Sequence, residues 1–155
     1  MHSDIRTSII ISDTSCLIAL TNIDHLNILK QLYEVILVTP EVAAEYGELL
    51  PEWIVTKPVK DTGKIKAFNR FIDLGEASAI ALALENEEAV LVIDDKEARL
   101  FASNLGLKIT GTLGILIRAT QKGITTDLPA LISQLTKIGF HLPSNINDLL
   151  KKLPD

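Results

Sequence analysis

One stretch decides the fold that this sequence predicts: Val90-Leu91-Val92-Ile93-Asp94-Asp95-Lys96-Glu97-Ala98-Arg99. Four apolar residues that favour strands stop at two adjacent carboxylates, and a helix-like pattern follows. The same design occurs near the start, where Ser8-Ile9-Ile10-Ile11-Ser12 runs into Asp13. In an open parallel α/β sheet, ligands bind outside the carboxyl ends of the strands. Two strands that end in acids at that edge therefore indicate a cation site.

Composition and charge narrow the class of protein. The length of 155 residues is near the usual single-domain size, and a hydrophobic content of 47% is ample for a continuous core. We expect residues 1–155 to form one domain, with a helical extension from about residue 125. The net charge of −5 argues against a protein that holds nucleic acid by bulk charge. It does not exclude a nuclease, because bound cations invert the sign of an acidic site.

Cysteine usage and the lengths of the apolar segments predict a cytoplasmic protein. The single cysteine, Cys16, cannot form an intramolecular disulfide, and no secretory leader pattern opens the chain. The apolar segments are shorter than the roughly 20 residues that a membrane helix needs. The three histidines lie far apart and show no metal-ligand spacing. We therefore expect no membrane segment and no histidine metal site.

The apolar runs and the helical patterns alternate along the chain, which predicts a three-layer α/β/α, Rossmann-like fold around a parallel sheet of about five strands. The expected strands are residues 8–12, 34–38, 53–56, 90–93 and 107–109. The expected helices are a first crossover over 17–32, then 40–46, 75–86, 96–104, 113–121, 128–137 and a tail helix over 144–152. Thr39, Asp73, Thr112 and Asp127 are the expected helix caps, and the interval 47–63 is expected to be a loop around a short strand.

Each acid near this edge also has an ordinary explanation. Asp13 is a favoured helix cap, and Glu76 matches the return acid of a capping box that Asp73 opens. Capping explains only one carboxylate of the Asp94-Asp95 pair, and adjacent acids repel each other. Glu45 lies past the first turn of its helix, so its ordinary role is a solvated surface.

The combination of acids favours a metal site. Parallel topology brings Asp13 and the Asp94-Asp95 pair to one edge of the sheet, and Glu45 and Glu76 lie on the neighbouring helices. Like charges that converge destabilise each other's ionised form. Divalent ions with oxygen ligands remove that cost.

These residues form a recognisable pattern, because the chain resembles the PIN-domain family, which includes VapC-type toxins. More closely, it is similar to a poorly characterised prokaryotic subfamily of PIN domains. The resemblance implies a ribonuclease that cuts single-stranded RNA with Mg²⁺ or Mn²⁺. It also implies a homodimer and an antitoxin partner. The matching segments are residues 11–15, 39–45, 74–82, 93–99 and 109–114.

The resemblance also assigns roles to single residues. It implies four catalytic acids and a metal site shared by the acids at the strand ends. The catalytic acids are Asp13, Glu45, Glu76 and Asp95, and the metal ligands are Asp13, Glu76, Asp94 and Asp95. We favour Asp95 as the fourth acid of the family, with Asp94 pointing into the same pocket or closing it.

Four further residues are predicted to support the acids: Thr14, Ser15, Arg99 and Thr112. The hydroxyls of Thr14 and Ser15 either orient the Asp13 carboxylate or only cap the helix. Arg99 either holds a phosphate or neutralises the acids. Basic residues that precede Glu76, among them Arg70, either guide RNA or form solvated surface.

Two alternatives to the nuclease can be compared with the sequence, and one of them remains open. A receiver-type phosphorelay domain needs paired acids at its first strand and a lysine after its fifth, and this chain has neither. A non-catalytic PIN-like module, which binds RNA or protein while its acids have structural roles, is the alternative that stays open. The apolar residues of 113–117 and 131–135 also predict a two-fold homodimer, because they offer more apolar surface than one sheet face requires.

Overall fold

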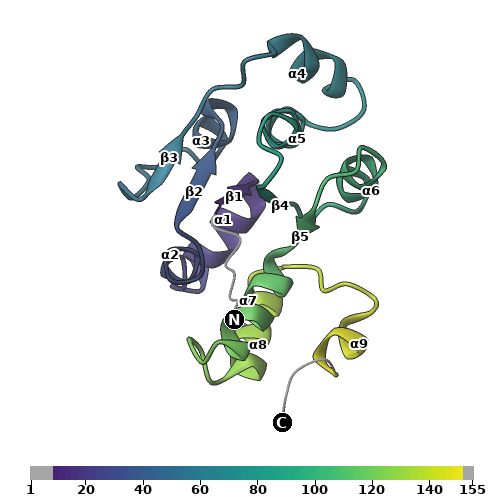
Figure 1. The fold of residues 1–155 in the computed structure, drawn as a ribbon. Coiled ribbons are helices and arrows are strands. Elements are labelled where there is room, and N and C mark those ends of the chain that lie inside the picture. The colour runs from purple at the N-terminus through teal and green to yellow at the C-terminus, as the bar shows by residue number, and fades with distance from the viewer. Residues whose placement is uncertain (1–8, 152–155) are drawn as a thin grey trace.

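A central sheet of five parallel strands organises the protein (Figure 1). The computed structural model describes residues 9–151. The strand order is β3-β2-β1-β4-β5, so the chain starts in the middle of the sheet and builds outward in both directions. The strands are β1 (Ile9–Ser12), β2 (Val35–Val38), β3 (Ile54–Thr56), β4 (Val90–Val92) and β5 (Ile109–Thr110).

The five predicted strands all exist, which confirms the expected three-layer α/β/α fold. Four of them lie within a residue of the expected bounds, and residue 8 lies outside the described part of the chain. The last strand is Ile109–Thr110 rather than 107–109. The central strand β1 pairs with β2 and with β4, and Ser12 lies beside Val92 in that register. The ends of β1 and β4 therefore lie side by side.

Helices cover both faces of the sheet (Figure 1). The helices are α1 (Thr14–Asn22), α2 (Asn27–Leu32), α3 (Pro40–Tyr46), α4 (Thr62–Phe68), α5 (Leu74–Leu84), α6 (Lys96–Asn104), α7 (Thr112–Gln121), α8 (Leu128–Lys137) and α9 (Ile146–Leu150). Ile10 and Val92 pack with α1, α2, α7 and α8, whereas Ile11 and Leu91 pack with α4, α5 and α6. Successive strand residues face opposite layers because side chains alternate across a strand.

Three helical predictions need correction. The first crossover is two helices, because the chain turns at Asp24, whose φ of 60° lies in the left-handed region. Helix α4 forms at the end of the interval expected to be a loop, and the Asp61 side chain caps it. The tail helix begins after Asn145 rather than at residue 144, and residue 152 lies outside the described residues. Across residues 9–151, none of the helices combines the length and apolar character needed to cross a membrane.

The apolar faces of α7 and α8 are buried within the protomer. Leu116 and Leu135 are fully buried, and Leu113 and Leu131 are 4% exposed, in the core that also contains α1 and α2. The surface that suggested a homodimer is therefore interior core. The expected dimer now depends on the family resemblance alone.

A cavity-forming substitution distinguishes these two uses of the apolar face. We expect Leu135→Ala to lower the free energy of unfolding by about 2–5 kcal/mol, because it removes a fully buried side chain. Denaturant unfolding measures the loss, and sedimentation of the same variant should show an unchanged mass. A variant of normal stability with a lower mass would place Leu135 at an intermolecular interface instead.

Candidate active site

Asp13 follows β1 directly and caps helix α1 with its side chain. Its Oδ1 accepts a hydrogen bond from the Cys16 backbone N–H at 2.9 Å. Its Oδ2 accepts from the Ser15 hydroxyl at 3.1 Å and from the Asp94 backbone N–H at 3.2 Å. The residue is 2% exposed. The carboxylate is thus fixed between two strand ends and a helix N-terminus.

Asp94 lies beside Asp13, at the end of β4, and Thr112 holds it from the next strand–helix connection. The Thr112 backbone N–H donates to Oδ1 of Asp94 at 2.8 Å, and the Thr112 hydroxyl donates to Oδ2 at 2.6 Å. Thr112 was expected to cap α7, but it is the first residue of that helix, and Gly111 occupies the cap position. A Cβ on Gly111 would lie 2.9 Å from Oδ1 of Asp94 and 3.0 Å from an Arg99 nitrogen. Only glycine leaves room for this carboxylate and guanidinium.

Arg99 is placed by the same cluster and lies against the strand end. Its guanidinium donates to the Ile93 carbonyl at 2.7 Å. Its positive charge lowers the pKa of Asp94, while burial raises that pKa above the ordinary value. Its charge effect on Asp94 agrees with the neutralising role, whereas its contact with the Ile93 carbonyl decides neither of the two roles predicted for Arg99.

The electrostatics identify Asp13 as an uncompensated acid. The pKa of Asp13 is raised from 3.8 to about 7, mainly by burial and then by the charge of Asp94. The hydrogen bonds from Cys16, Asp94 and Ser15 oppose the rise without cancelling it. Two carboxyl groups therefore compete for ionisation at this point, and either a proton or a cation relieves the competition.

Glu45 contacts the site from α3, one helix away. Its Oε1 accepts from the Thr14 hydroxyl at 2.6 Å, and its Oε2 accepts from the Gly75 backbone N–H at 3.0 Å. A Cβ on Gly75 would overlap this carboxylate, with 2.8 Å to its Cδ and 2.9 Å to Oε2. Glu45 thus bridges the N-termini of α1 and α5, and Thr14 binds Glu45 rather than Asp13.

Glu76 and Asp95 form a second acidic group. The pKa of Glu76 is raised from 4.5 to about 8, mainly by burial, then by the neighbouring Asp73 and by Asp95. Asp73 caps α5 by accepting from the Glu76 N–H at 3.3 Å, as the capping box predicted. Asp95 is exposed and caps α6, where its Oδ2 accepts from the Ala98 N–H at 3.0 Å.

The adjacent acids Asp94 and Asp95 therefore separate into different groups. Asp94 lies with Asp13, and Asp95 lies with Glu76. The two groups meet at one edge of the sheet. Among residues 9–151, no three or more His, Cys, Asp or Glu side chains are arranged as a metal-binding group.

Sequence reasoning missed the two glycines that allow these contacts. Gly75 donates its N–H to Glu45, and Gly111 leaves space for Asp94 and Arg99. Both glycines occur at helix N-termini next to a candidate site residue, in Leu74-Gly75-Glu76 and Thr110-Gly111-Thr112. A glycine at such a place, where a polar side chain or a cap is favoured, is the signal that could have found them.

Two buried hydroxyls tie the helices of this edge together. Thr39 caps α3 through the Val42 N–H, and its Oγ1 lies 2.6 Å from Oγ of Ser78 in α5. The Ser78 hydroxyl also donates to the Gly75 carbonyl at 2.8 Å. Both side chains are fully buried. The helices that carry Glu45 and Glu76 are therefore joined by a hydrogen-bonded pair.

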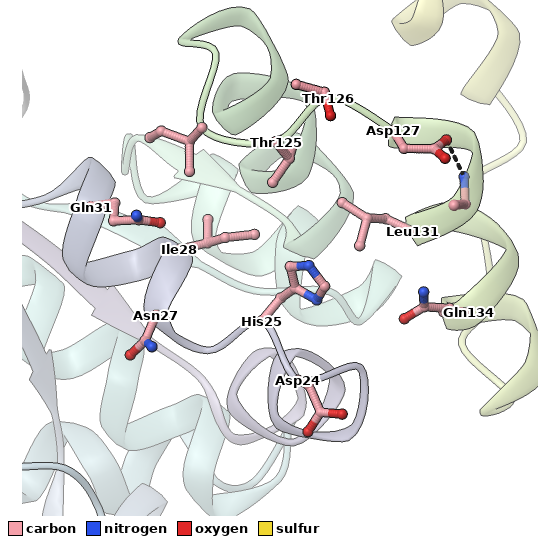
Figure 2. Close-up of a pocket in the computed structure, with 12 residues that line it drawn as sticks. Asp24, His25, Asn27, Ile28, Gln31, Thr125, Thr126, Asp127, Leu131 and Gln134 are labelled. Carbon is pink, nitrogen blue, oxygen red and sulfur yellow. Dashed lines mark hydrogen bonds between the residues drawn. The ribbon is translucent and has the colours of Figure 1, made fainter.

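A cavity lies away from the candidate site, where α1 turns into α2 and where α7 connects to α8 (Figure 2). Its volume is about 370 Å³, and His25, Ile28 and Leu131 face each other across it. The His25 Nδ1 lies 2.5 Å from the Ile23 carbonyl, so a local backbone contact occupies that nitrogen. None of the predicted site residues lines this cavity.

A comparison with protein families decides the class of the protein. A family model described as a PIN domain matches residues 9–154. The chain belongs to the PIN-domain family. PIN domains are generally nucleases, and the nucleases among them usually use divalent metal ions. No curated protein and no solved structure gives a significant match to the chain.

The donor chemistry of this PIN domain fits a divalent metal ion. The Asp13–Asp94 pair offers only oxygen ligands, and the hydrogen bonds to Asp13 from the described residues do not offset the rise in its pKa that burial and the charge of Asp94 cause. Mg²⁺ is commonly bound by one or two carboxylates, and water and phosphate oxygens complete its shell. Two carboxylates therefore suffice, even though residues 9–151 do not assemble three.

The raised pKa values predict how the metal-free protein responds to pH. The folded state holds protons on Asp13 and Glu76 more tightly than the unfolded state, so their stabilising contribution is complete below about pH 4 and lost as pH rises through the folded pKa values. We expect the melting temperature in EDTA to fall between about pH 5 and pH 8. Asp94→Asn should flatten this fall, because it removes the charge that opposes ionisation of Asp13. A melting temperature that rises over the same range would contradict the prediction.

Proposed function

We propose that this PIN domain is a metal-dependent endoribonuclease that cuts single-stranded RNA. The observation that carries the proposal is the buried, uncompensated carboxyl group of Asp13 beside Asp94, at the carboxyl ends of two adjacent parallel strands. Ligands of open parallel sheets bind at this edge. A single carboxylate is enough to cap α1, so capping of that helix does not account for the second acid placed beside Asp13.

Asp13 and Asp94 would hold the ion, Mg²⁺ or Mn²⁺, and Glu76 and Asp95 would extend the acidic surface toward the substrate. When bound, a divalent ion supplies a Lewis acid that lowers the pKa of water and offsets the charge of a phosphodiester. The chain's own groups fix the ligands beforehand. Ser15 holds Asp13, and the amide and hydroxyl of Thr112 hold both oxygens of Asp94.

A non-catalytic module is the second candidate, and the side-chain hydrogen bonds of two acids favour it. Glu45 joins two helix N-termini, and Asp95 caps α6. These are structural roles that need no metal. Asp13 and Asp94 also make structural hydrogen bonds, to the start of α1 and to Thr112, but these bonds do not explain why two acids are buried side by side, so the nuclease is the better conclusion.

The resemblance to VapC-type toxins extends the proposal to a toxin role, with an antitoxin protein as partner and a two-fold homodimer as the assembly. These features are family expectations, and the nuclease proposal does not depend on them.

Metal binding and cleavage test the function together. We expect Mg²⁺ or Mn²⁺ to support cleavage of a short single-stranded RNA, and Asp94→Asn to abolish it. Asparagine suits this position structurally, because its oxygen keeps the Thr112 amide bond and its NH₂ can donate to the Thr112 hydroxyl. Asp13→Asn should also be inactive, although its NH₂ cannot replace an oxygen that accepts from both Ser15 and Asp94.

The same proteins should separate in a thermal-shift experiment. An ion that binds only the folded state at a hundredfold excess over its Kd stabilises by about 2.7 kcal/mol, or roughly 5–10 °C for a chain of this size. Asp94→Asn should lose most of that shift. Asp127→Asn is the matched control, because it changes an exposed cap of α8 away from the site. If millimolar Mn²⁺ leaves the wild-type melting temperature unchanged at neutral pH, the non-catalytic module becomes the better function.

Gly75 allows the position of Glu45 to be tested without removing the acid. We expect Gly75→Ala to lower kcat for RNA cleavage at least tenfold, because its Cβ would displace the Glu45 carboxylate from the N-terminus of α5. The fold should persist, since alanine favours the helix and the Glu45 side chain is exposed enough to move. Unchanged cleavage by a folded Gly75→Ala protein would show that the placement of Glu45 has no part in activity.

A further inference from the structure

Beside the candidate active site, a cavity of about 370 Å³ opens between the α4–α5 turn and the start of α6. Its acidic wall consists of Asp73, Glu76, Asp95 and Glu97, so it is continuous with the second acidic group of the candidate site. The lining residues outside this acidic wall come from the turn itself. They are Asn69, Arg70, Phe71 and Ile72.

Phe71 is unusual in this setting because an aromatic ring is left in solvent. The chain has four phenylalanines in all, and three of them gather here: Phe68, Phe71 and Phe101. Phe68 and Phe101 meet edge to face at 5.2 Å, with an interplanar angle of 72°. Phe71 leans over Phe101 at 6.1 Å and 31°, yet remains 69% exposed. Burial of an apolar core does not explain a ring held in this way.

The turn that carries Phe71 is held by backbone hydrogen bonds. The Phe71 N–H donates to the Phe68 carbonyl at 2.9 Å, and the Ile72 N–H donates to the same carbonyl at 3.1 Å. Ile72 also packs against the buried cluster that contains α5 and α6. The ring is therefore attached to a fixed support, which lowers the entropy lost when a ligand contacts it.

We propose that Phe71 is a stacking platform for an unpaired base of the RNA substrate, next to the phosphodiester that the acids act on, with Arg70 contacting the RNA backbone. This assignment rests on the proposed nuclease function and adds a base-binding subsite to it. Proteins that bind single-stranded nucleic acid combine exposed aromatic rings with basic side chains in this manner. Because stacking needs a free base face, the subsite requires a substrate that is single-stranded at this position.

The small apolar part of the lining argues against a protein partner, while four of the eight lining residues are acidic and oppose a phosphate backbone unless bound cations offset their charge. Only Phe71 and Ile72 of its eight lining residues are apolar, whereas the core of a protein interface needs a wider apolar patch. Arg70 supplies the one positive charge among those eight residues, on the turn that carries the ring. The subsite therefore joins an exposed π face to a cation within one short segment.

Binding of a short single-stranded RNA to the full chain tests the subsite. The measurement uses fluorescence anisotropy in the Asp94→Asn background, where we expect no cleavage. Phe71→Ala should weaken binding roughly five- to hundredfold, as expected for one stacked base. Phe71→Trp should bind as well as the parent, and RNA should quench its new tryptophan emission above the background of Trp53, the single tryptophan of the chain. Phe71→Leu should bind as weakly as Phe71→Ala, because leucine is apolar but cannot stack.

Two controls separate stacking from other effects of the substitution. Leu49→Ala, which removes an apolar side chain that is 98% exposed and lies outside the cavity, should leave RNA binding unchanged. An RNA with abasic residues should bind the parent and Phe71→Ala equally. Phe71→Ala removes the Phe71–Phe101 ring contact but keeps the Phe68–Phe101 contact, so we expect a folded protein with only a small fall in melting temperature.

The outcomes distinguish this proposal from the nuclease proposal. Full binding by Phe71→Ala would overturn the stacking platform, whatever the cleavage result. Recovery of binding by Phe71→Leu would also overturn it, because an apolar contact without stacking would then be enough to bind the RNA. RNA that binds through Phe71 but is never cut by the wild-type chain would confirm the platform and reject the nuclease.

Discussion

The buried carboxylate of Asp13 is the constraint on which the site depends. Its two oxygens accept hydrogen bonds from the Cys16 amide, the Ser15 hydroxyl and the Asp94 amide, so it joins β1, α1 and β4 at one point. These bonds also fix it beside a second acid, where burial and the charge of Asp94 favour its protonated form. The neighbouring groups affect the ionisation of the two acids. Thr112 and Arg99 lower the pKa of Asp94, and a divalent ion would relieve the repulsion that remains.

Capping and chemistry share the same side chains in this protein. Five helices begin at an aspartate whose side chain accepts a bond from the helix backbone, so an acid at a helix start is ordinary here. Burial is what separates the members of this set. Asp127 caps α8 in solvent, whereas Asp13 caps α1 at 2% exposure and faces another acid. An ordinary structural role is therefore no argument against a catalytic one, and the useful question is whether capping alone would require the burial.

The sequence predicted the sheet and the edge that carries the acids, because both depend on local patterns that end abruptly at Asp13 and at Asp94. It did not predict what depends on contacts between distant segments. Asp94 and Asp95 are adjacent and chemically equal, and the side chain that distinguishes them is Thr112, 18 positions away. The break between α1 and α2 has no glycine to mark it, since Asp24 itself takes the left-handed conformation. Helix α4 was not predicted, because it buries a single side chain and so lacks the apolar stripe by which a helix is detected in a sequence.

The hydroxyl pair Thr39–Ser78 has a mechanical consequence for the protein. It joins the N-cap of α3 to the fifth residue of α5 inside the core, and the Ser78 hydroxyl donates to the Gly75 carbonyl. The Thr39 hydroxyl therefore donates to Ser78, and a shift of one helix alone would leave this buried donor without an acceptor, which costs roughly 1–3 kcal/mol. Relative movement of the two helices that carry Glu45 and Glu76 therefore has a cost, and the two acids keep their spacing when the edge of the sheet is disturbed.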